Sequence, residues 1–166
     1  MLLDLLKERF GADLLETISA HGEDTVVVDR DRAIEILARL RDDPQFAFKL
    51  LLDVTAVDWI DRNPRFEVVY HLRSITLGLW MRLKIRVAEP NPWVHTAAKL
   101  WNSADWLERE CYDMFGIHFE GHPDLRRILM YDSFEGHPLR KDYPVGRRQP
   151  IVPETNPVLK PLRQSR

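Results

Sequence analysis

The sequence predicts an α+β fold of two layers, a small mixed sheet with packed helices, followed by an extended, basic, proline-rich C-terminal arm. Residues 79–87 alternate apolar and polar side chains, the pattern of a strand with one buried face. Residues 103–115 instead place apolar side chains three and four positions apart, the pattern of an amphipathic helix. After Gly116 this periodicity fades and glycine, proline and charge become frequent, which favours loops.

The composition is that of one soluble domain. The chain has 166 residues, of which 45% are hydrophobic and 30% charged, enough to bury a core. A net charge of -2 argues against a general nucleic-acid binder, which usually carries a strongly basic domain. No stretch approaches the roughly 20 apolar residues of a membrane span. We therefore expect a cytoplasmic chain that reaches a membrane only through partner subunits.

The first third of the chain is expected to alternate helix and strand. Residues 1–18 are apolar at helical spacing, and His21-Gly22 would end that helix. A β-branched run at 25–29 predicts a strand. Asp29 or Asp31 would cap the next helix, which ends at Asp42-Asp43-Pro44.

The middle of the chain predicts the rest of the sheet. Residues 46–52 are apolar enough for either a buried helix or a strand, and this ambiguity stays open. The remaining elements are expected in the following order: strand 53–60, turn 61–64, strand 66–72, loop 74–78, strand 79–87, and helices at about 93–101 and 103–115.

The helix at 103–115 carries two kinds of side chain. Its apolar face holds Leu107, Cys111, Met114 and Phe115. Another face holds Asp105, Arg109 and Asp113, four residues apart, a spacing that allows charge pairs. Local physics favours a solvated face for these charges. Gly116 would cap the helix, because glycine readily adopts the left-handed conformation.

A short duplication follows the helix. The sequence Phe-Glu-Gly-His-Pro occurs at 119–123 and again at 134–138, which predicts two similar turns. His122 and His137 suggest a metal site, with Asp124 or Cys111 as a further ligand, but zinc sites need three or four ligands at recognised spacings. We expect instead that each imidazole bonds a backbone group and fixes its turn.

No catalytic motif emerges from the residues, and we expect no catalytic, cofactor or metal site. Cys111, the single cysteine, lies on an apolar helix face, which favours a buried, inert thiol. Glu108, Glu110 and Asp113 could act as acids or bases, but a helix so rich in charge is usually a surface. The tryptophans are expected to be core or interface anchors, namely Trp59, Trp80, Trp93, Trp101 and Trp106.

The chain divides into three segments by character. Residues 1–116 form the predicted globular domain, residues 117–144 a loop region with two Gly-His-Pro turns, and residues 145–166 the extended arm. From Pro138 onward there are six of the 11 prolines, and seven Lys or Arg against two acids. Such a segment cannot form a core alone, so it is either a disordered tail or an arm that folds on another protein.

Residues 108–144 carry a more specific pattern. Glu108-Arg109-Glu110 is followed by Asp113, by the apolar pair Met114-Phe115, and by His122 after a six-residue gap. Arg126 and the aliphatic pair Ile128-Leu129 complete this first block, and residues 136–144 read Gly-His-Pro-Leu-Arg-Lys-Asp-Tyr-Pro. This pattern closely resembles the signature of a known family, the C subunits of the bacterial-type NADH:quinone oxidoreductase, respiratory complex I.

The resemblance implies a structural and assembly subunit without redox chemistry, in the peripheral arm of a proton-translocating enzyme. That enzyme passes electrons from NADH through flavin and iron–sulfur centres to quinone. Those cofactors would lie in partner subunits and not in this chain. Its partners would be other subunits of the peripheral arm, chiefly the terminal iron–sulfur subunit and the quinone-cavity subunit. The chain would be peripheral, on the cytoplasmic face of the bacterial inner membrane. Its candidate interface residues are Glu108, Arg109, Asp113, His122, Arg126, Arg127, His137, Arg140 and Lys141.

Three alternatives remain. The chain could be the homologous subunit of a membrane-bound hydrogenase complex. It could be a small metal-dependent hydrolase that uses His122 and His137. It could also be a free-standing adaptor without a redox complex.

Overall fold

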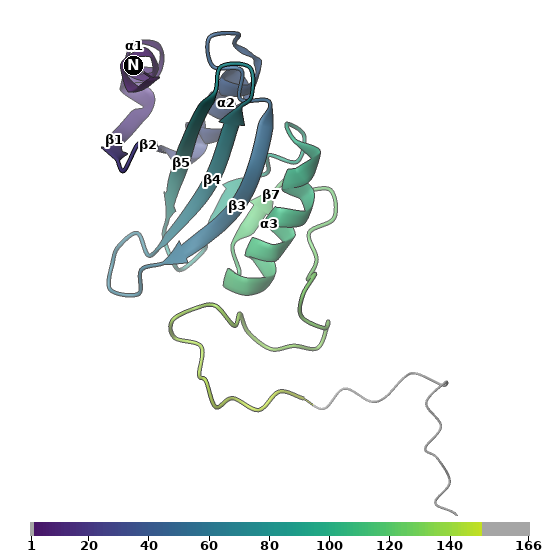
Figure 1. Cartoon of the computed structure of the whole chain (residues 1–166). Helices are drawn as coiled ribbons and strands as arrows, with labels where there is room; N and C mark the ends of the chain where they lie inside the picture. Colours follow the sequence, from purple (N-terminus) through teal and green to yellow (C-terminus); the bar gives the residue numbers. More distant parts are fainter. Residues whose placement is uncertain (1, 151–166) are drawn as a thin grey trace, which may run out of the picture.

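The structure is a computed structural model that describes residues 2–150, and its centre is a five-stranded mixed sheet of order β1-β2-β5-β4-β3 (Figure 1). β2 and β5 are parallel, and every other neighbouring pair is antiparallel. The strands are β1 Leu14–Ala20, β2 Glu23–Val28, β3 Leu50–Asp58, β4 Phe66–Ser74 and β5 Leu79–Val87. The predicted α+β class with a small mixed sheet is confirmed.

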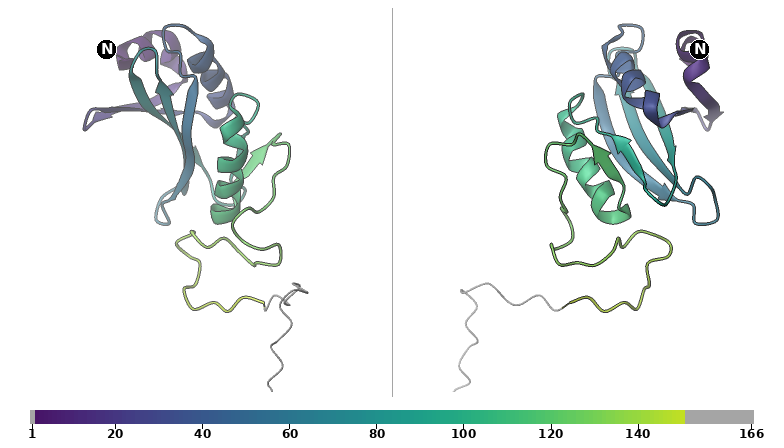
Figure 2. Two further views of the ribbon diagram at one scale, coloured as in Figure 1. Left: turned by 45° about the vertical axis from the view of Figure 1, so that its right-hand side comes forward. Right: turned by 180° about the vertical axis from the view of Figure 1, so that it is seen from behind.

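Helices α2 and α3 lie over one face of this sheet, as the rear view in Figure 2 shows. A short parallel pair of strands, β6 and β7, lies beside α3. No helix within residues 2–150 is long and apolar enough to cross a membrane. The remaining elements are α1 Leu2–Phe10, the 3-10 turn Gly11–Asp13, α2 Arg30–Asp42, β6 Trp93–His95, α3 Asn102–Phe115 and β7 His118–Glu120.

The core lies between the sheet and its helices. Val26, Tyr70 and Leu83 lie opposite one another on β2, β4 and β5, and all three are fully buried. Their neighbours along the strands point to the other face, where Glu67 pairs with Lys84 at 3.1 Å. This alternation is the reason the predictions of β4 and β5 succeed, because one face of each of these two strands is apolar over most of its length.

The prediction of a helix over residues 1–18 is wrong beyond Phe10. Residues 14–20 form β1, and His21 and Gly22 make the hairpin turn to β2 with positive φ angles of 55° and 78°. Two successive positive φ angles match the twist of a tight hairpin. Pairing with the buried strand β2 therefore overrides the helical spacing of the first residues.

Most other elements agree with expectation. Asp29 caps α2 by accepting a hydrogen bond from Asp31 N, 2.8 Å away. The strands predicted at 25–29, 53–60, 66–72 and 79–87 are present with small shifts of their ends. The ambiguous segment 46–52 divides, since β3 begins at Leu50 and the residues before it form a buried loop.

The helix predicted at 93–101 is wrong. Residues 93–95 form β6, which pairs with the unpredicted strand β7, and residues 98–100 form a turn. Helix α3 matches the predicted 103–115 closely, and Gly116 caps it in the left-handed conformation with φ 73°. Beyond β7, residues 121–150 have no regular secondary structure, and the prediction for the arm at 151–166 lies outside the described residues.

Candidate functional site

Arg109 and Asp113 of α3 are buried, so the expectation of a solvated face is wrong for these two residues, whereas Asp105 is partly exposed. Glu108 and Asp113 have no exposed surface and Arg109 is 7% exposed. Residues 117–144, here called the signature loop, fold back over the helix in the views of Figure 2. The buried charges therefore face this loop or the sheet, and each has identifiable partners.

Asp113 holds the middle of the signature loop. Its carboxylate accepts hydrogen bonds from the backbone N–H groups of Ile128, Leu129 and Met130 at 2.8–3.0 Å, and from the Arg127 guanidinium at 2.7 Å. Burial raises the pKa of Asp113, but the bonds from Met130 and Arg127 outweigh it and leave that pKa below its usual value. Asp113 is thus an ionised anchor for three consecutive backbone donors.

Arg109 and Arg127 hold the same loop through its carbonyl groups. Arg109 donates to the carbonyl oxygens of Arg126 and Arg127, both at 3.2 Å, and its guanidinium lies 5.2 Å from the Trp106 ring. Arg127 also donates to Gly136 O at 3.0 Å, which joins the middle of the loop to the second Gly-His-Pro turn. The part of the loop beyond β7, which has no regular secondary structure, is therefore held by guanidinium groups that take the place of strand partners.

The two duplicated histidines bond α3. The His122 ring Nε2 lies 3.1 Å from Asp105 O, and its Nδ1 accepts from Asp124 N at 3.0 Å. The His137 Nδ1 lies 3.0 Å from Asp113 O. The expectation that each imidazole bonds a backbone group is confirmed. Residues 2–150 contain no group of three or more His, Cys, Asp or Glu arranged to hold a metal ion.

Glu108 points toward the segment after β6. It accepts from Thr96 Oγ1 at 2.5 Å and from Ala97 N at 2.7 Å. Burial raises the pKa of Glu108 to about 7, against these two hydrogen bonds. The side chain joins α3 to the sheet of β6 and β7 and has no exposed surface with which to meet a partner.

Arg65 is a central residue that sequence reasoning missed. Its guanidinium pairs with both carboxylate oxygens of Asp58 at 2.7 Å, and with Asp142 and Glu89. Lys141 N donates to the same Asp58 carboxylate at 2.7 Å. The Arg65 guanidinium lowers the pKa of Asp58 below its usual value. Arg65 and Asp142 are 77 residues apart, so local reasoning from the sequence had no signal for this pair.

Arg140 closes the loop against the end of α3. It donates to Phe115 O, and Leu139 N donates to Met114 O at 3.1 Å. Gly116 leaves the room for this approach, since a Cβ there would lie 2.5 Å from His137 Nε2. The glycine is therefore required by its positive φ angle and by the packing of the second turn.

Of the nine candidate interface residues, only Arg126 and Lys141 are exposed, whereas His122, Arg127, His137 and Arg140 are partly buried. Besides charged side chains, the loop exposes several large apolar ones. Beside the loop, Trp106 of α3 is 62% exposed, whereas Trp101 is buried. The large apolar side chains exposed on the loop and the segment after it are Leu129, Tyr131, Leu139 and Val145. The buried charges thus hold a loop whose outer side carries the features of a contact surface.

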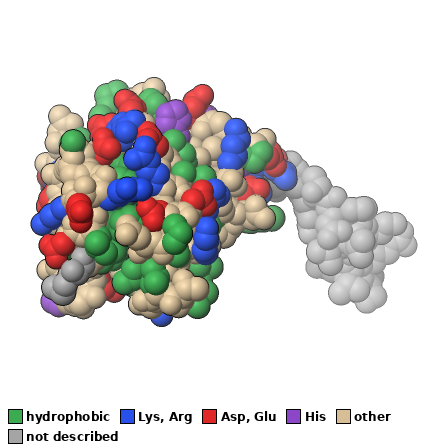
Figure 3. All heavy atoms as spheres, turned by 90° about the horizontal axis from the view of Figure 1, so that it is seen from above, with side chains coloured by type: hydrophobic (Ala, Val, Ile, Leu, Met, Phe, Trp, Pro, Cys, Tyr) green, Lys and Arg blue, Asp and Glu red, His purple; other side chains and the backbone are tan. Residues whose placement is uncertain are grey.

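The opposite end of the molecule differs. Figure 3 shows Lys and Arg interspersed with Asp and Glu on the face seen from above, with no single patch of one sign. A mixed face of this kind gives no long-range steering toward a charged polymer.

Comparisons with known proteins agree with the sequence signature. Residues 26–149 match the family described as the 30 kDa subunit of the respiratory-chain NADH dehydrogenase. The C subunit of the NADH-quinone oxidoreductase of Citrifermentans bemidjiense is 53% identical over 140 residues, which cover 84% of this chain and 86% of the relative. The corresponding protein of Geobacter sulfurreducens is 48% identical over 141 residues, with the same coverage of both chains.

Two solved structures share the fold. A trypsin-resistant fragment (1–134) of Nqo5 has a TM-score of 0.66 and 35% identity, and the match covers 75% of this chain and 98% of the fragment. A chain of the membrane-bound sulfane sulfur reductase, an archaeal respiratory membrane complex, has a TM-score of 0.71 and 26% identity, covering 87% of this chain and 84% of that one. The chain belongs to the family of the 30 kDa subunit of respiratory complex I, which includes the C subunits of the NADH-quinone oxidoreductases.

Proposed function

We propose that this chain is a scaffold of the peripheral arm of a proton-translocating NADH:quinone oxidoreductase and performs no electron transfer itself. The observation that carries the proposal is the signature loop, which Asp113, Arg109 and Arg127 hold in place while Leu129 and Tyr131 stay exposed. A preordered loop binds a partner at lower entropic cost than a flexible one.

The proposed partners are the terminal iron–sulfur subunit and the quinone-cavity subunit, with flavin and clusters held outside this chain. Cys111 supports this assignment, because it is the single cysteine and its thiol donates to Val54 O inside the core. Burial raises the pKa of the Cys111 thiol, which disfavours the thiolate that cluster ligation needs. Through these partners the chain would be held at the cytoplasmic face of the inner membrane.

The test is a pull-down of the tagged chain from its native membranes in mild detergent, with mass spectrometry and an NADH:quinone assay on the eluate. We expect iron–sulfur and membrane subunits to co-purify with that activity. Elution of the chain alone would contradict the scaffold and favour the adaptor, while stoichiometric bound metal would favour the hydrolase.

A matched pair of variants locates the contact. Leu129→Glu places a charge on the exposed side of the loop, and Ile75→Glu does the same in the β4–β5 turn, where the side chain is 73% exposed. We expect Leu129→Glu to reduce recovery of the partners at least tenfold, and Ile75→Glu to leave it unchanged. Equal recovery with both variants would remove the loop from the interface.

A second candidate is a subunit of a related respiratory complex, such as the membrane-bound hydrogenase type. The archaeal sulfane sulfur reductase supports it, because that complex contains a chain of this fold. The same eluate discriminates the two, since nickel–iron subunits and hydrogen-dependent activity would replace the NADH:quinone activity.

A further inference from the structure

The strand β3 lies at one edge of the sheet. Trp59 N donates to Arg65 O at 2.8 Å. With the register of the β3–β4 pair, this bond shows which residues of β3 direct their backbone N–H and C=O groups toward β4. Val57, two residues earlier, therefore bonds β4, whereas Ala56 and Asp58 direct their backbone N–H and C=O groups away from it. The backbone groups of Val54 point away from β4 as well.

Helix α3 covers only the first part of this edge. Ser103 Oγ donates to Leu51 O at 3.2 Å, and Cys111 Sγ donates to Val54 O at 3.4 Å, so side chains of the helix satisfy those carbonyls. The helix then ends at Phe115. Beyond it, Ala56 and Asp58 line an open groove of about 680 Å³.

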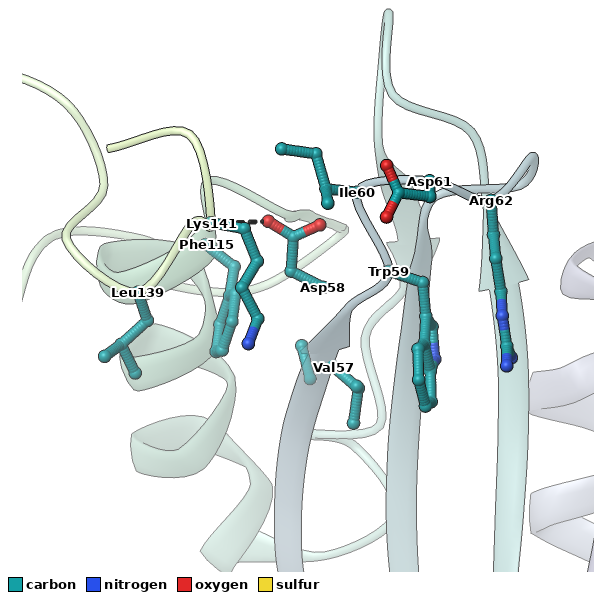
Figure 4. A pocket seen from close by; sticks show the side chains of 10 residues that line it. Val57, Asp58, Trp59, Ile60, Asp61, Arg62, Phe115, Leu139 and Lys141 are labelled. Atoms are coloured by element: carbon teal, nitrogen blue, oxygen red, sulfur yellow. Dashed lines mark hydrogen bonds between the residues drawn. The ribbon is translucent and has the colours of Figure 1, made fainter. Parts of the chain in front are cut away.

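The walls of this groove are mostly apolar. Figure 4 shows Phe115 and Leu139 on the side of α3 and the signature loop, and Val57 and Trp59 on the side of β3. Leu139 is 53% exposed. The groove thus combines apolar surface with strand groups that have no hydrogen-bond partner within residues 2–150, and β-strand addition uses these two features.

The rim of the groove carries a net positive charge. Lys141 and Arg62 line it and form no ion pair among the described residues, against one acid, Asp61. Asp58 does not change this balance, because Arg65 neutralises it. A chain that fits the groove would therefore carry an acidic side chain beside Lys141.

We propose that an extended segment of a partner polypeptide adds as a strand to the free edge at the end of β3, at residues 56–58. Alternate apolar side chains of that segment would contact Phe115, Leu139 and Ile60, and an acidic side chain would meet Lys141. This proposal rests on the proposed function, because a neighbouring subunit supplies the segment.

The test is amide hydrogen exchange, resolved to single residues, on the full chain alone and in the purified complex. We expect the outward N–H groups of Ala56 and Asp58 to exchange rapidly in the free chain and at least about a hundredfold more slowly in the complex. The N–H of Val57, which bonds β4, should be protected in both. Unchanged exchange of Ala56 and Asp58 in the intact complex would overturn strand addition and leave the scaffold standing.

A second measurement identifies the occupant. A photoreactive amino acid in place of Leu139 is expected to crosslink, in the complex, to one partner segment with alternating apolar residues and an acid. Crosslinks to a partner helix, or within this chain only, would overturn the proposal. If the wild-type chain does not co-purify with any complex, the scaffold fails and the groove proposal fails with it.

Discussion

The sheet and the signature loop are stabilised by different interactions. In the sheet, apolar side chains such as Tyr70 and Leu83 are fully buried and the backbone bonds its neighbours in ladders. In the loop, backbone groups bond polar side chains of α3, chiefly Asp113 and Arg109. Apolar burial is spread over many residues, whereas the order of the loop depends on a few charged ones, so single polar substitutions should separate the two regions.

Arg65 joins the two regions, and its loss should have the largest effect. Arg65→Ala leaves Asp58 buried without its cation and also releases Asp142, so we expect a loss of about 3–5 kcal/mol in the free energy of unfolding. Urea denaturation measures it. Arg73→Ala in the adjoining strand β4 is the control, and an equal loss there would show that Arg65 has no special role.

The junction of α3 with β6 should weaken as pH rises. Glu108 has a folded pKa of about 7 against an ordinary value of 4.5, so its contribution is full below 4.5 and is lost as pH rises through 7. The loss is on the order of 3 kcal/mol. Glu108→Gln should remove this dependence between pH 5 and 8 in thermal unfolding, and the exposed Glu110→Gln should keep it.

The signature loop should have the opposite pH dependence. The folded pKa of Asp113 lies below 3.8, so its contribution is full above 3.8 and is lost as pH falls through that lower value. Asp113→Asn should cost about 1.5–3 kcal/mol locally, by weakening charge-assisted bonds. We expect faster trypsin cleavage after Arg126 and Arg127 at neutral pH, with the sheet still folded. Cooperative loss of the sheet in the same variant would mean that the two regions are one unit.

The smallest effect is expected at the exposed pair of Asp124 and Arg126. The two side chains are 59% and 69% exposed, and such pairs contribute little. Asp124→Asn should leave both the denaturation midpoint and the cleavage rate unchanged. A large change would show that this pair, rather than Asp113, orders the loop.

The predictions from sequence were most reliable where one face of an element is apolar throughout. The strands at 66–72 and 79–87 and the helix at 103–115 show this pattern, and all three are present. The pattern misled at residues 14–20, where the apolar spacing continues that of a helix, and at 93–95, where β6 depends on a strand more than 20 residues away. In both cases the secondary structure depends on the strand with which the segment pairs, and local spacing carries no information about that strand.

The candidate site shows the same division. The sequence singled out Arg109, Asp113, His122 and His137, and the structure places all four in contact with the loop or the helix it covers. Local reasoning assigned the charges of α3 to solvent because helix spacing shows which residues share a face but not what covers it. Arg65 was missed because a single arginine between a turn and a strand carries no local signal.

The sequence by itself determined the α+β class, the strong helix and strands, and, through the motif at 108–144, the family. These depend on periodicity and residue identity, which are local. Only the tertiary structure decided that α3 buries its charges, that Arg65 reaches Asp142, and that the edge of β3 stays open beyond Phe115. Those properties arise from contacts between residues far apart in the chain, whose geometry exists only after folding.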